Sequence, residues 1–130
     1  MLVPSSSFQI RPLNGEIDDK VLLSQLNDEE LSLVLSNMQA DPFIKRKTMD
    51  ILSFKGSLNT IRNEGYAVSS GELIMGFMCA CAPIKNYLLP AVLIVVGPDV
   101  RMKAKIKDII NEIVNAAATI SNNLQKYQGI

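Results

Sequence analysis

The reactive side chains that stand out in this sequence are two cysteines in one apolar run, Cys79 and Cys81. If the run is a strand, both thiols lie on the same face of a sheet, because residues i and i+2 share a face. Two ligands do not complete a four-ligand zinc site. The chain has no histidine, so it lacks His-dependent catalytic triads, His-ligated metals and the usual general base near neutral pH. We expect two small buried side chains in a reducing compartment, with no metal, no cofactor and no enzymatic activity.

Composition indicates one folded domain. Of the 130 residues 48% are apolar, and 13 basic residues balance 13 acidic ones. A neutral chain argues against sequence-independent nucleic-acid binding, and the basic run Ile44–Lys47 fits a solvated connection better than a nucleic-acid patch. The longest apolar run, Tyr87–Val96, is too short to span a bilayer, and the N-terminus does not resemble a signal peptide. We expect a cytoplasmic protein with no membrane contact.

Apolar residues at helical spacing predict four helices, over residues 16–26, 28–38, about 50–64 and 102–124. The first should turn Asp18 and Asp19 outward. Asn27 followed by Glu30 predicts a capping box at the start of the second helix, and Gly65 predicts a left-handed end of the third. The buried face of the second helix is predicted from four residues, Leu31, Leu33, Val34 and Leu35.

The fourth helix is predicted as one continuous element of about seven turns. Its apolar stripe either covers the sheet or packs in part on a second subunit. Arg101, Lys103 and Lys105 lie at its N-terminal end, where they oppose the helix dipole. They would therefore need a carboxylate nearby.

Two apolar runs predict an antiparallel pair of strands in the core. Leu73–Ala82 is the first, closed by Pro83, and Leu88–Val96 is the second, closed by Gly97 and Pro98. Upstream, a short extended segment is predicted at residues 66–68, followed by a turn at residues 69–71.

Short motifs occur in a recognisable order along the chain. The central ones are Ile61-Arg62-x-x-Gly65-Tyr66-Ala67, Glu72, the run from Gly76 to Pro83 with Cys79, and the apolar run that ends at Gly97-Pro98. Upstream come Pro12-Leu13, Lys20 with Leu22-Leu23, and Glu29-Glu30-Leu31. Together they resemble the effector-binding domain of IclR-type bacterial and archaeal transcription regulators. The resemblance covers about Pro12 to Leu124, with Asn14, Glu16 and Asp19 departing from the family pattern.

The resemblance implies an α/β (α+β) fold of the GAF/profilin-like kind, an antiparallel sheet flanked by helices, with a long C-terminal helix. It also implies that residues 1–130 form a single truncated effector-binding domain without a DNA-binding domain. By the same resemblance, we expect the family's helix-turn-helix and early sheet strands to be missing from these residues. A sheet that lacks those strands has an exposed edge, which predicts a homodimer or homotetramer.

The family's effector pocket lies between the sheet and the loop that opens the first helix, and it binds small organic or aromatic acids. By resemblance, its positions fall on Glu16, Ile17, Ser69, Cys79, Ile94 and Val96. Most polar positions of the family are not kept, and a buried carboxylate without donors is costly. We expect a pocket altered toward a larger apolar ligand, or one that has lost its ligand. An equally open alternative is that these strand residues are only turn and core.

Two functions remain open. The first is an effector-sensing and oligomerisation domain, which binds a small organic, aromatic or apolar acid and controls DNA through a helix-turn-helix outside this chain. The second is a ligand-free structural module, which dimerises or pairs with a full-length regulator. A cavity lined by Ser69 and Cys79 favours the first function. A solid core with a large apolar contact between chains favours the second.

Overall fold

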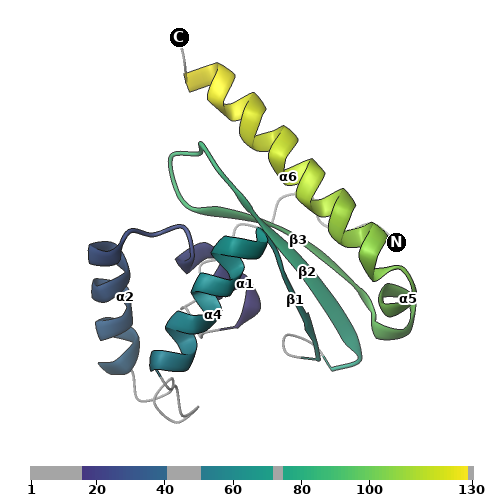
Figure 1. The fold of residues 1–130 in the computed structure, drawn as a ribbon, viewed down its shortest axis with the longest axis horizontal. Coiled ribbons are helices and arrows are strands. Elements are labelled where there is room, and N and C mark those ends of the chain that lie inside the picture. Colours follow the sequence, from purple (N-terminus) through teal and green to yellow (C-terminus); the bar gives the residue numbers. More distant parts are fainter. Residues whose placement is uncertain (1–15, 41–50, 72–74, 129–130) are drawn as a thin grey trace.

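The computed structural model describes residues 16–40, 51–71 and 75–128 (Figure 1). The basic run at 44–47 lies outside these residues. The elements in order are α1 (Ile17–Leu23), α2 (Asp28–Ala40), α4 (Ile51–Glu64), β1 (Ala67–Ser70), β2 (Phe77–Ile84), β3 (Ala91–Pro98), α5 (Asp99–Ala104) and α6 (Ile106–Gln128). The three strands form an antiparallel sheet in the order β1-β2-β3. The prediction of a mixed α/β fold, with an antiparallel sheet flanked by helices and a long C-terminal helix, is confirmed.

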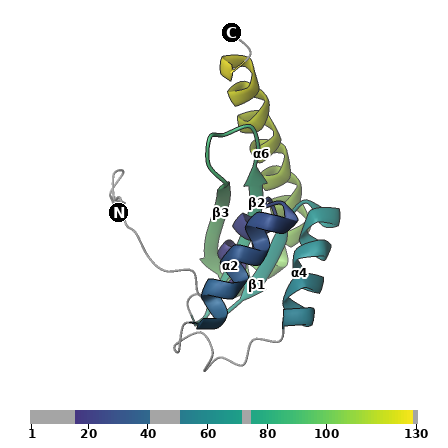
Figure 2. The same ribbon diagram turned by 90° about the vertical axis from the view of Figure 1, so that its left-hand side faces the viewer.

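Helices cover both faces of the sheet, and alternation along β2 separates the two cores (Figures 1 and 2). Cys79 and Cys81 pack with residues of α1 and α4, whereas Met78, Ala80 and Ala82 pack with residues of α5 and α6. This is the two-residue period expected of a strand that is buried on both sides. Both cysteines are buried thiols outside any disulfide bond, and their burial agrees with the sequence prediction.

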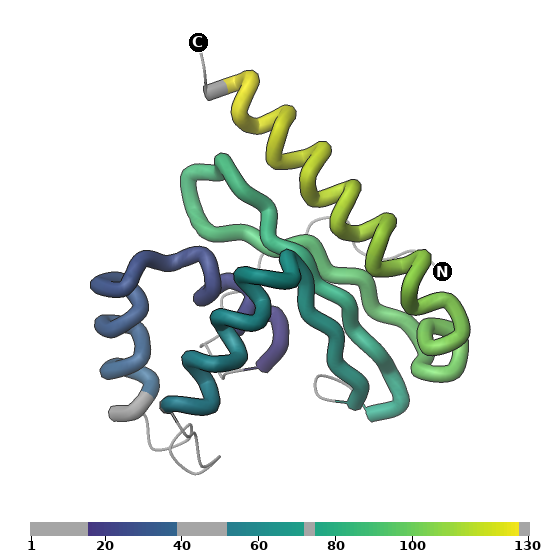
Figure 3. Tube along the Cα trace, viewed as in Figure 1, coloured from purple at the N-terminus to yellow at the C-terminus, as the bar shows by residue number. Residues whose placement is uncertain are grey.

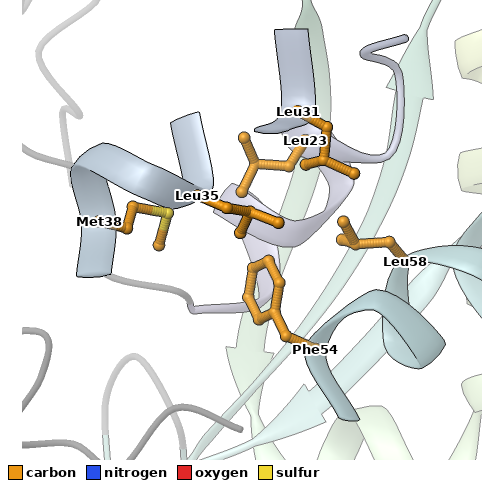
Figure 4. Close-up of a cluster of buried hydrophobic side chains, with 6 residues drawn as sticks. All are labelled: Leu23, Leu31, Leu35, Met38, Phe54 and Leu58. Atoms are coloured by element: carbon orange, nitrogen blue, oxygen red, sulfur yellow. The ribbon is translucent and has the colours of Figure 1, made fainter. Parts of the chain in front are cut away.

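A third cluster holds α2 against α1 and α4, away from the sheet (Figure 4). Its members are Leu23, Leu31, Leu35, Met38, Phe54 and Leu58. The predicted capping box opens α2: Glu30 N–H donates to Asn27 Oδ1 at 2.8 Å, and Asn27 N–H donates to Glu30 Oε1 at 3.1 Å. The prediction that Leu33 is buried is wrong, because its side chain is 69% exposed.

The third predicted helix ends where the sequence indicated. Gly65 adopts φ +80°, and its N–H donates to the carbonyl of Ile61 at 2.8 Å. A left-handed residue at this place is the usual glycine end of a helix. The chain then enters β1, which includes Ser69 and Ser70 and therefore extends past the predicted end of the segment. Gly71 follows the strand with φ +73°.

The two long strands form the predicted antiparallel pair, but their bounds differ. Pro83 lies inside β2 instead of closing it. The reason is the direction of its nitrogen. Gly71 N–H donates to Phe77 O at 2.8 Å, so Phe77, and by alternation Pro83, direct their backbone polar groups toward β1. Pairing with β1 reaches only as far as Cys81, so Pro83 interrupts no ladder hydrogen bond.

The predicted continuous C-terminal helix is instead two helices, α5 and α6, separated at Lys105 with φ −125°. The break lets Met102 of α5, which is 4% exposed, reach the same core cluster as Ile113 of α6. The break also overturns the expectation that the basic residues oppose the helix dipole. Arg101 and Lys103 lie in the last turn of α5, where cations favour the negative end of the helix dipole.

Candidate functional site

The candidate site lies on the face of the sheet that packs against α1 and α4. Strand pairing sets Ser69 of β1 opposite Cys79 of β2, and Cys79 opposite Val96 of β3. Directly paired residues of neighbouring strands point to the same face, so these three side chains form one row across the sheet. Ile94 continues the same face and pairs with Cys81. Four of the six predicted site residues therefore share one face.

The other two predicted residues, Glu16 and Ile17, are at the start of α1. Glu16 precedes the helix with extended backbone angles, φ −72° and ψ 174°, and its carbonyl accepts the N–H of Lys20 at 2.9 Å. Ile17 is 7% exposed and belongs to the same buried cluster as Cys79. The start of α1 is thus packed against the sheet, with Ile17 in the core and Glu16 half-buried.

Asp18 and Asp19 follow, and the prediction that they point outward is wrong. They are 7% and 2% exposed. The helix is short and packs on the sheet and on α4 (Figure 3). Five of its seven residues are buried. The first turn of a helix carries unpaired N–H groups and the positive end of the dipole, which lowers the cost of burying a carboxylate there.

Ser69 carries the most informative polar atom of the row. Its hydroxyl oxygen is buried, and among the described residues it has no hydrogen-bond partner. A buried hydroxyl without a partner costs roughly 1–3 kcal/mol. Ser70, the next residue, faces the other way and donates to Asp99 Oδ1 at 2.6 Å. The two serines are thus chemically different neighbours on opposite faces of β1.

The centre of the row is buried, whereas the side chains of β3 at its end are partly exposed to solvent. Cys79 is only 2% exposed, whereas Ile94 and Val96 are 36% and 47% exposed. The side chains of the row that come from the strands carry no charge. The site can therefore offer an apolar surface with one buried hydroxyl, which suits a mainly apolar ligand with a single polar group.

Sequence reasoning missed a hollow near the turn between β2 and β3. It has a volume of about 420 Å³ and is lined by Ser24, Gln25, Ile61, Arg62, Gly65, Pro83, Lys85 and Asn86. An adjoining hollow of about 270 Å³ lies between the same turn and α6. None of the six predicted site residues lines either hollow. No spacing in the sequence indicates them, because their walls come from segments far apart in the chain.

Arg62, a residue of the recognised motif, has a structural role at this hollow. Its Nε donates to the carbonyl of Ser24 at 2.8 Å, its Nη2 to the carbonyl of Leu26 at 3.3 Å, and its Nη1 to Asn59 Oδ1 at 3.0 Å. It thereby satisfies carbonyls at the C-terminal end of α1. On the other side, Gln25 Nε2 donates to the carbonyl of Ala91 at the start of β3, at 2.7 Å.

Within the ranges that the structure describes, no helix is long and apolar enough to cross a membrane. The same residues contain no group of three or more His, Cys, Asp or Glu side chains that could hold a metal ion.

Comparison with known families decides the relationship of the chain. Residues 10–122 match the model of the bacterial transcriptional regulator IclR C-terminal domain. This chain belongs to the IclR C-terminal domain family. The family's domain is the effector-binding domain of transcriptional regulators, so the match also explains the motif order around Gly65 and Cys79. No curated protein sequence matches the chain well enough to count as a relative.

Solved structures agree with the family in fold. A C-terminal domain of a transcriptional regulator from Vibrio cholerae is 27% identical, with a TM-score of 0.62, over 78% of this chain and 59% of that one. The IclR effector domain from Acinetobacter sp. ADP1 is 18% identical, with a TM-score of 0.69, over 92% and 70%. The C-terminal domain of Escherichia coli KdgR is 22% identical, with a TM-score of 0.68, over 87% and 71%. The IclR-family chain thus spans about six to seven tenths of each of these structures.

Proposed function

We propose that residues 1–130 act as one small-molecule effector-sensing and oligomerisation domain of an IclR-type transcriptional regulator, and not as an enzyme. Its ligand would bind between the start of α1 and the row formed by Ser69, Cys79 and Val96, with Glu16, Ile17 and Ile94 around it. Control of DNA would pass through a helix-turn-helix outside these residues. A regulator of this family works where the DNA is, which in bacteria is the cytoplasm.

The buried hydroxyl of Ser69 carries the proposal. Among the described residues no group hydrogen-bonds to it, although it lies in register with Cys79 beneath the helix that carries Ile17. A ligand with a hydrogen-bonding group would remove the cost of this unpaired hydroxyl and would gain contact with the apolar surface at Ile94 and Val96. The neutral, apolar row favours an apolar or aromatic acid whose carboxylate stays near the rim.

Thermal unfolding with a panel of small carboxylic acids, aromatic acids and apolar metabolites tests this function. A ligand present at a hundredfold its Kd should stabilise the fold by about 2.7 kcal/mol, which raises the Tm measurably. Ser69→Ala should leave the free domain equally or more stable, because it deletes an unpaired buried hydroxyl. It should also reduce the ligand-induced rise in Tm. Ser70→Ala, on the opposite face of β1, is the control and should keep that rise.

Two outcomes would contradict the proposal. A panel without any shift in Tm would remove the sensor function. A shift that is equal in the parent protein and in Ser69→Ala would place the ligand elsewhere, and the hollow beside Lys85 and Asn86 would then be the next site to probe.

A second candidate is a ligand-free structural module that pairs with another regulator chain. The near-complete burial of Cys79 and Ile17, 2% and 7% exposed, favours it, because side chains already fill the centre of the row. If the protein is folded and oligomeric but no compound of the panel raises its Tm, that result would support the structural module over the sensor.

A further inference from the structure

The turn between β2 and β3 has a hollow on either side of it. The hollow on the side of α1 and α4 has a volume of about 420 Å³, and the one on the side of α6 has about 270 Å³. Gly65, Pro83, Lys85 and Asn86 line both. The larger hollow lies within the range of roughly 300–1,000 Å³ that is usual for small-molecule sites, and it is separate from the row at Ser69.

Side-chain hydrogen bonds hold the walls of the larger hollow in place. On one side, Gln25 Nε2 donates to the carbonyl of Ala91 at 2.7 Å. On the other side, the N–H of Lys85 donates to Ser121 Oγ at 2.8 Å, and Asn86 Nδ2 donates to the carbonyl of Ser121 at 2.9 Å. The turn is thus fixed both to the end of α1 and to α6. A site whose walls are already fixed loses less free energy to ordering when a ligand binds.

The charged side chains that line the larger hollow are both cationic. Arg62 comes from α4 and Lys85 from the turn, and among the described residues that line the hollow none is acidic. Arg62 hydrogen-bonds to two backbone carbonyls and one side-chain amide, all of them uncharged. These bonds therefore leave the positive charge of the guanidinium without an opposite charge. Two cations from different walls of one hollow favour an anion with two negative charges.

The same hollow also has hydrogen-bond donors that its own bonds do not use. A guanidinium has five N–H donors, and Arg62 uses one on each of its three nitrogens, which leaves one N–H on each terminal nitrogen. A side-chain amide has two N–H donors, of which Gln25 and Asn86 each use one. The ammonium of Lys85 adds further donors on a flexible stem. Ile61 supplies apolar surface for the carbon atoms of a ligand.

We propose that the larger hollow is a second ligand site, which binds a small organic dianion, either a dicarboxylate or a phosphomonoester. The anionic oxygens would accept hydrogen bonds from Arg62 of α4 and from Lys85 of the turn, with the amides of Gln25 and Asn86 as further donors. None of the six residues of the candidate effector site lines this hollow. The inference therefore goes beyond the effector proposal and does not depend on it.

A ligand at this place would connect helices that cover opposite faces of the sheet (Figure 1). Arg62 belongs to α4 on one face, whereas the turn that carries Lys85 is hydrogen-bonded to Ser121 of α6 on the other. The dianion would add bonds between α4 and the turn. Because these groups come together only in the folded chain, the ligand should raise the Tm as its concentration increases.

Isothermal titration calorimetry of the full chain with succinate and with glycerol phosphate tests the site. We expect at least one of the two to bind, whereas their uncharged analogues, succinamide and glycerol, should not. Binding of succinate alone would assign the site to dicarboxylates, and binding of glycerol phosphate alone would assign it to phosphomonoesters. The affinity should fall as sodium chloride is added, because the side chain of Lys85 is exposed and its charge is screened by salt.

A charge reversal at the turn tests the position of the site. Lys85→Glu should lower the affinity about tenfold or more, because it replaces an attractive charge by a repulsive one. The variant should keep the fold, since the side chain is exposed and the bond to Ser121 uses the backbone N–H. Lys107→Glu, exposed in the first turn of α6, is the control. It changes the net charge of the chain equally and should leave the affinity unchanged.

Four outcomes would overturn the proposal. The first is the absence of binding of either dianion at millimolar concentration. The second is an equal affinity in Lys85→Glu and in the parent protein. The third is an equal loss in Lys85→Glu and Lys107→Glu, which would indicate a response to net charge alone. The fourth is a loss in Ser69→Ala with none in Lys85→Glu, which would place the anion in the candidate effector site.

Discussion

At the scale of single residues, burial separates side chains that the sequence alone treats as equivalent. Leu58 of α4 is completely buried beside Phe54 and Leu35, whereas Leu33 of α2 is 69% exposed (Figure 4). Both are leucines in helices within an apolar pattern. The contribution of each leucine to stability depends on how much of its apolar surface is buried on folding. The cost of truncating it also depends on how far its neighbours can fill the cavity that is left.

Leu58→Ala should lower the free energy of unfolding by about 2–5 kcal/mol, because it removes buried apolar atoms and leaves a cavity. Leu33→Ala makes the same chemical change at an exposed position and should alter stability by less than about 0.5 kcal/mol. Urea unfolding followed by circular dichroism measures both. Equal losses for the two variants would show that α2 and α4 do not pack as described.

Another residue-scale lesson concerns Arg62, which belongs to the motif that led to the family. Its hydrogen bonds to the backbone carbonyls of Ser24 and Leu26 hold the end of α1 against α4, and its third bond, to the side chain of Asn59, lies within α4. Lys20 of α1 adds a contact between the same two helices, because its Nζ lies 5.8 Å from the centroid of the Phe54 ring. A residue can thus mark a ligand-sensing family while it holds helices together.

At the scale of elements, the start of α2 and the end of α4 were predicted correctly. Asn27 and Glu30 form the reciprocal capping box that their spacing indicated, and Gly65 ends α4 with a left-handed backbone. Both devices involve atoms within four residues of each other. The bonds therefore form as soon as the local chain is helical, whatever packs around it.

Asn27→Ala should destabilise the fold by about 1 kcal/mol, because it leaves the N–H of Glu30 without its side-chain acceptor. Asn111, which is exposed in the second turn of α6, provides the control. There the same substitution should raise stability by a few tenths of a kcal/mol, because alanine has the higher helix propensity. Thermal unfolding distinguishes the expected loss of stability at Asn27 from the expected gain at Asn111. A loss of the same size at both positions would count against the capping role.

At the scale of the whole molecule, α6 is the element that closes the second core. It runs diagonally across the face of the sheet opposite α1 and α4, and its upper end extends past the strands (Figure 1). Close approach depends on small residues, since Ala117 of α6 packs in one cluster with Ala80 and Ala82 of β2. The contact is therefore sensitive to volume on either side.

Ala117→Leu should cost about 1–3 kcal/mol, because a larger side chain at a position that is 3% exposed forces α6 away from the sheet. Ala116→Leu is the matched control. It makes the same change on an exposed part of the same helix and should be nearly neutral. Urea unfolding gives both values. If Ala117→Leu were also neutral, the packing of α6 on β2 would have to be looser than described.

Much of the fold and part of the candidate site could be predicted from the sequence. The motif order indicated the IclR family, and the family model confirms it over residues 10–122. The antiparallel pair of strands and the burial of Cys79 also followed, because apolar runs bounded by turn residues have few alternatives. Whether Glu16, Ile17, Ser69, Cys79, Ile94 and Val96 bind an effector stays a prediction.

Other features depended on neighbours that are distant in the sequence. Asp18 and Asp19 are acidic and were expected in solvent, yet the packing of a short helix between the sheet and α4 buries both. Pro83 was expected to end a strand. It does not, because β1 is short and leaves the nitrogen of Pro83 without a ladder to interrupt.

The sequence by itself determined much of the local structure of this protein: the capping box at Asn27, the glycine end of α4 at Gly65 and the apolar strands. Its motifs also indicated the family. These local features follow from propensities and hydrogen bonds between residues a few positions apart. The tertiary structure alone decided the row Ser69–Cys79–Val96 and the division of the last helix at Lys105. These depend on strand register and on which segments pack together, and such contacts join residues that no local pattern relates.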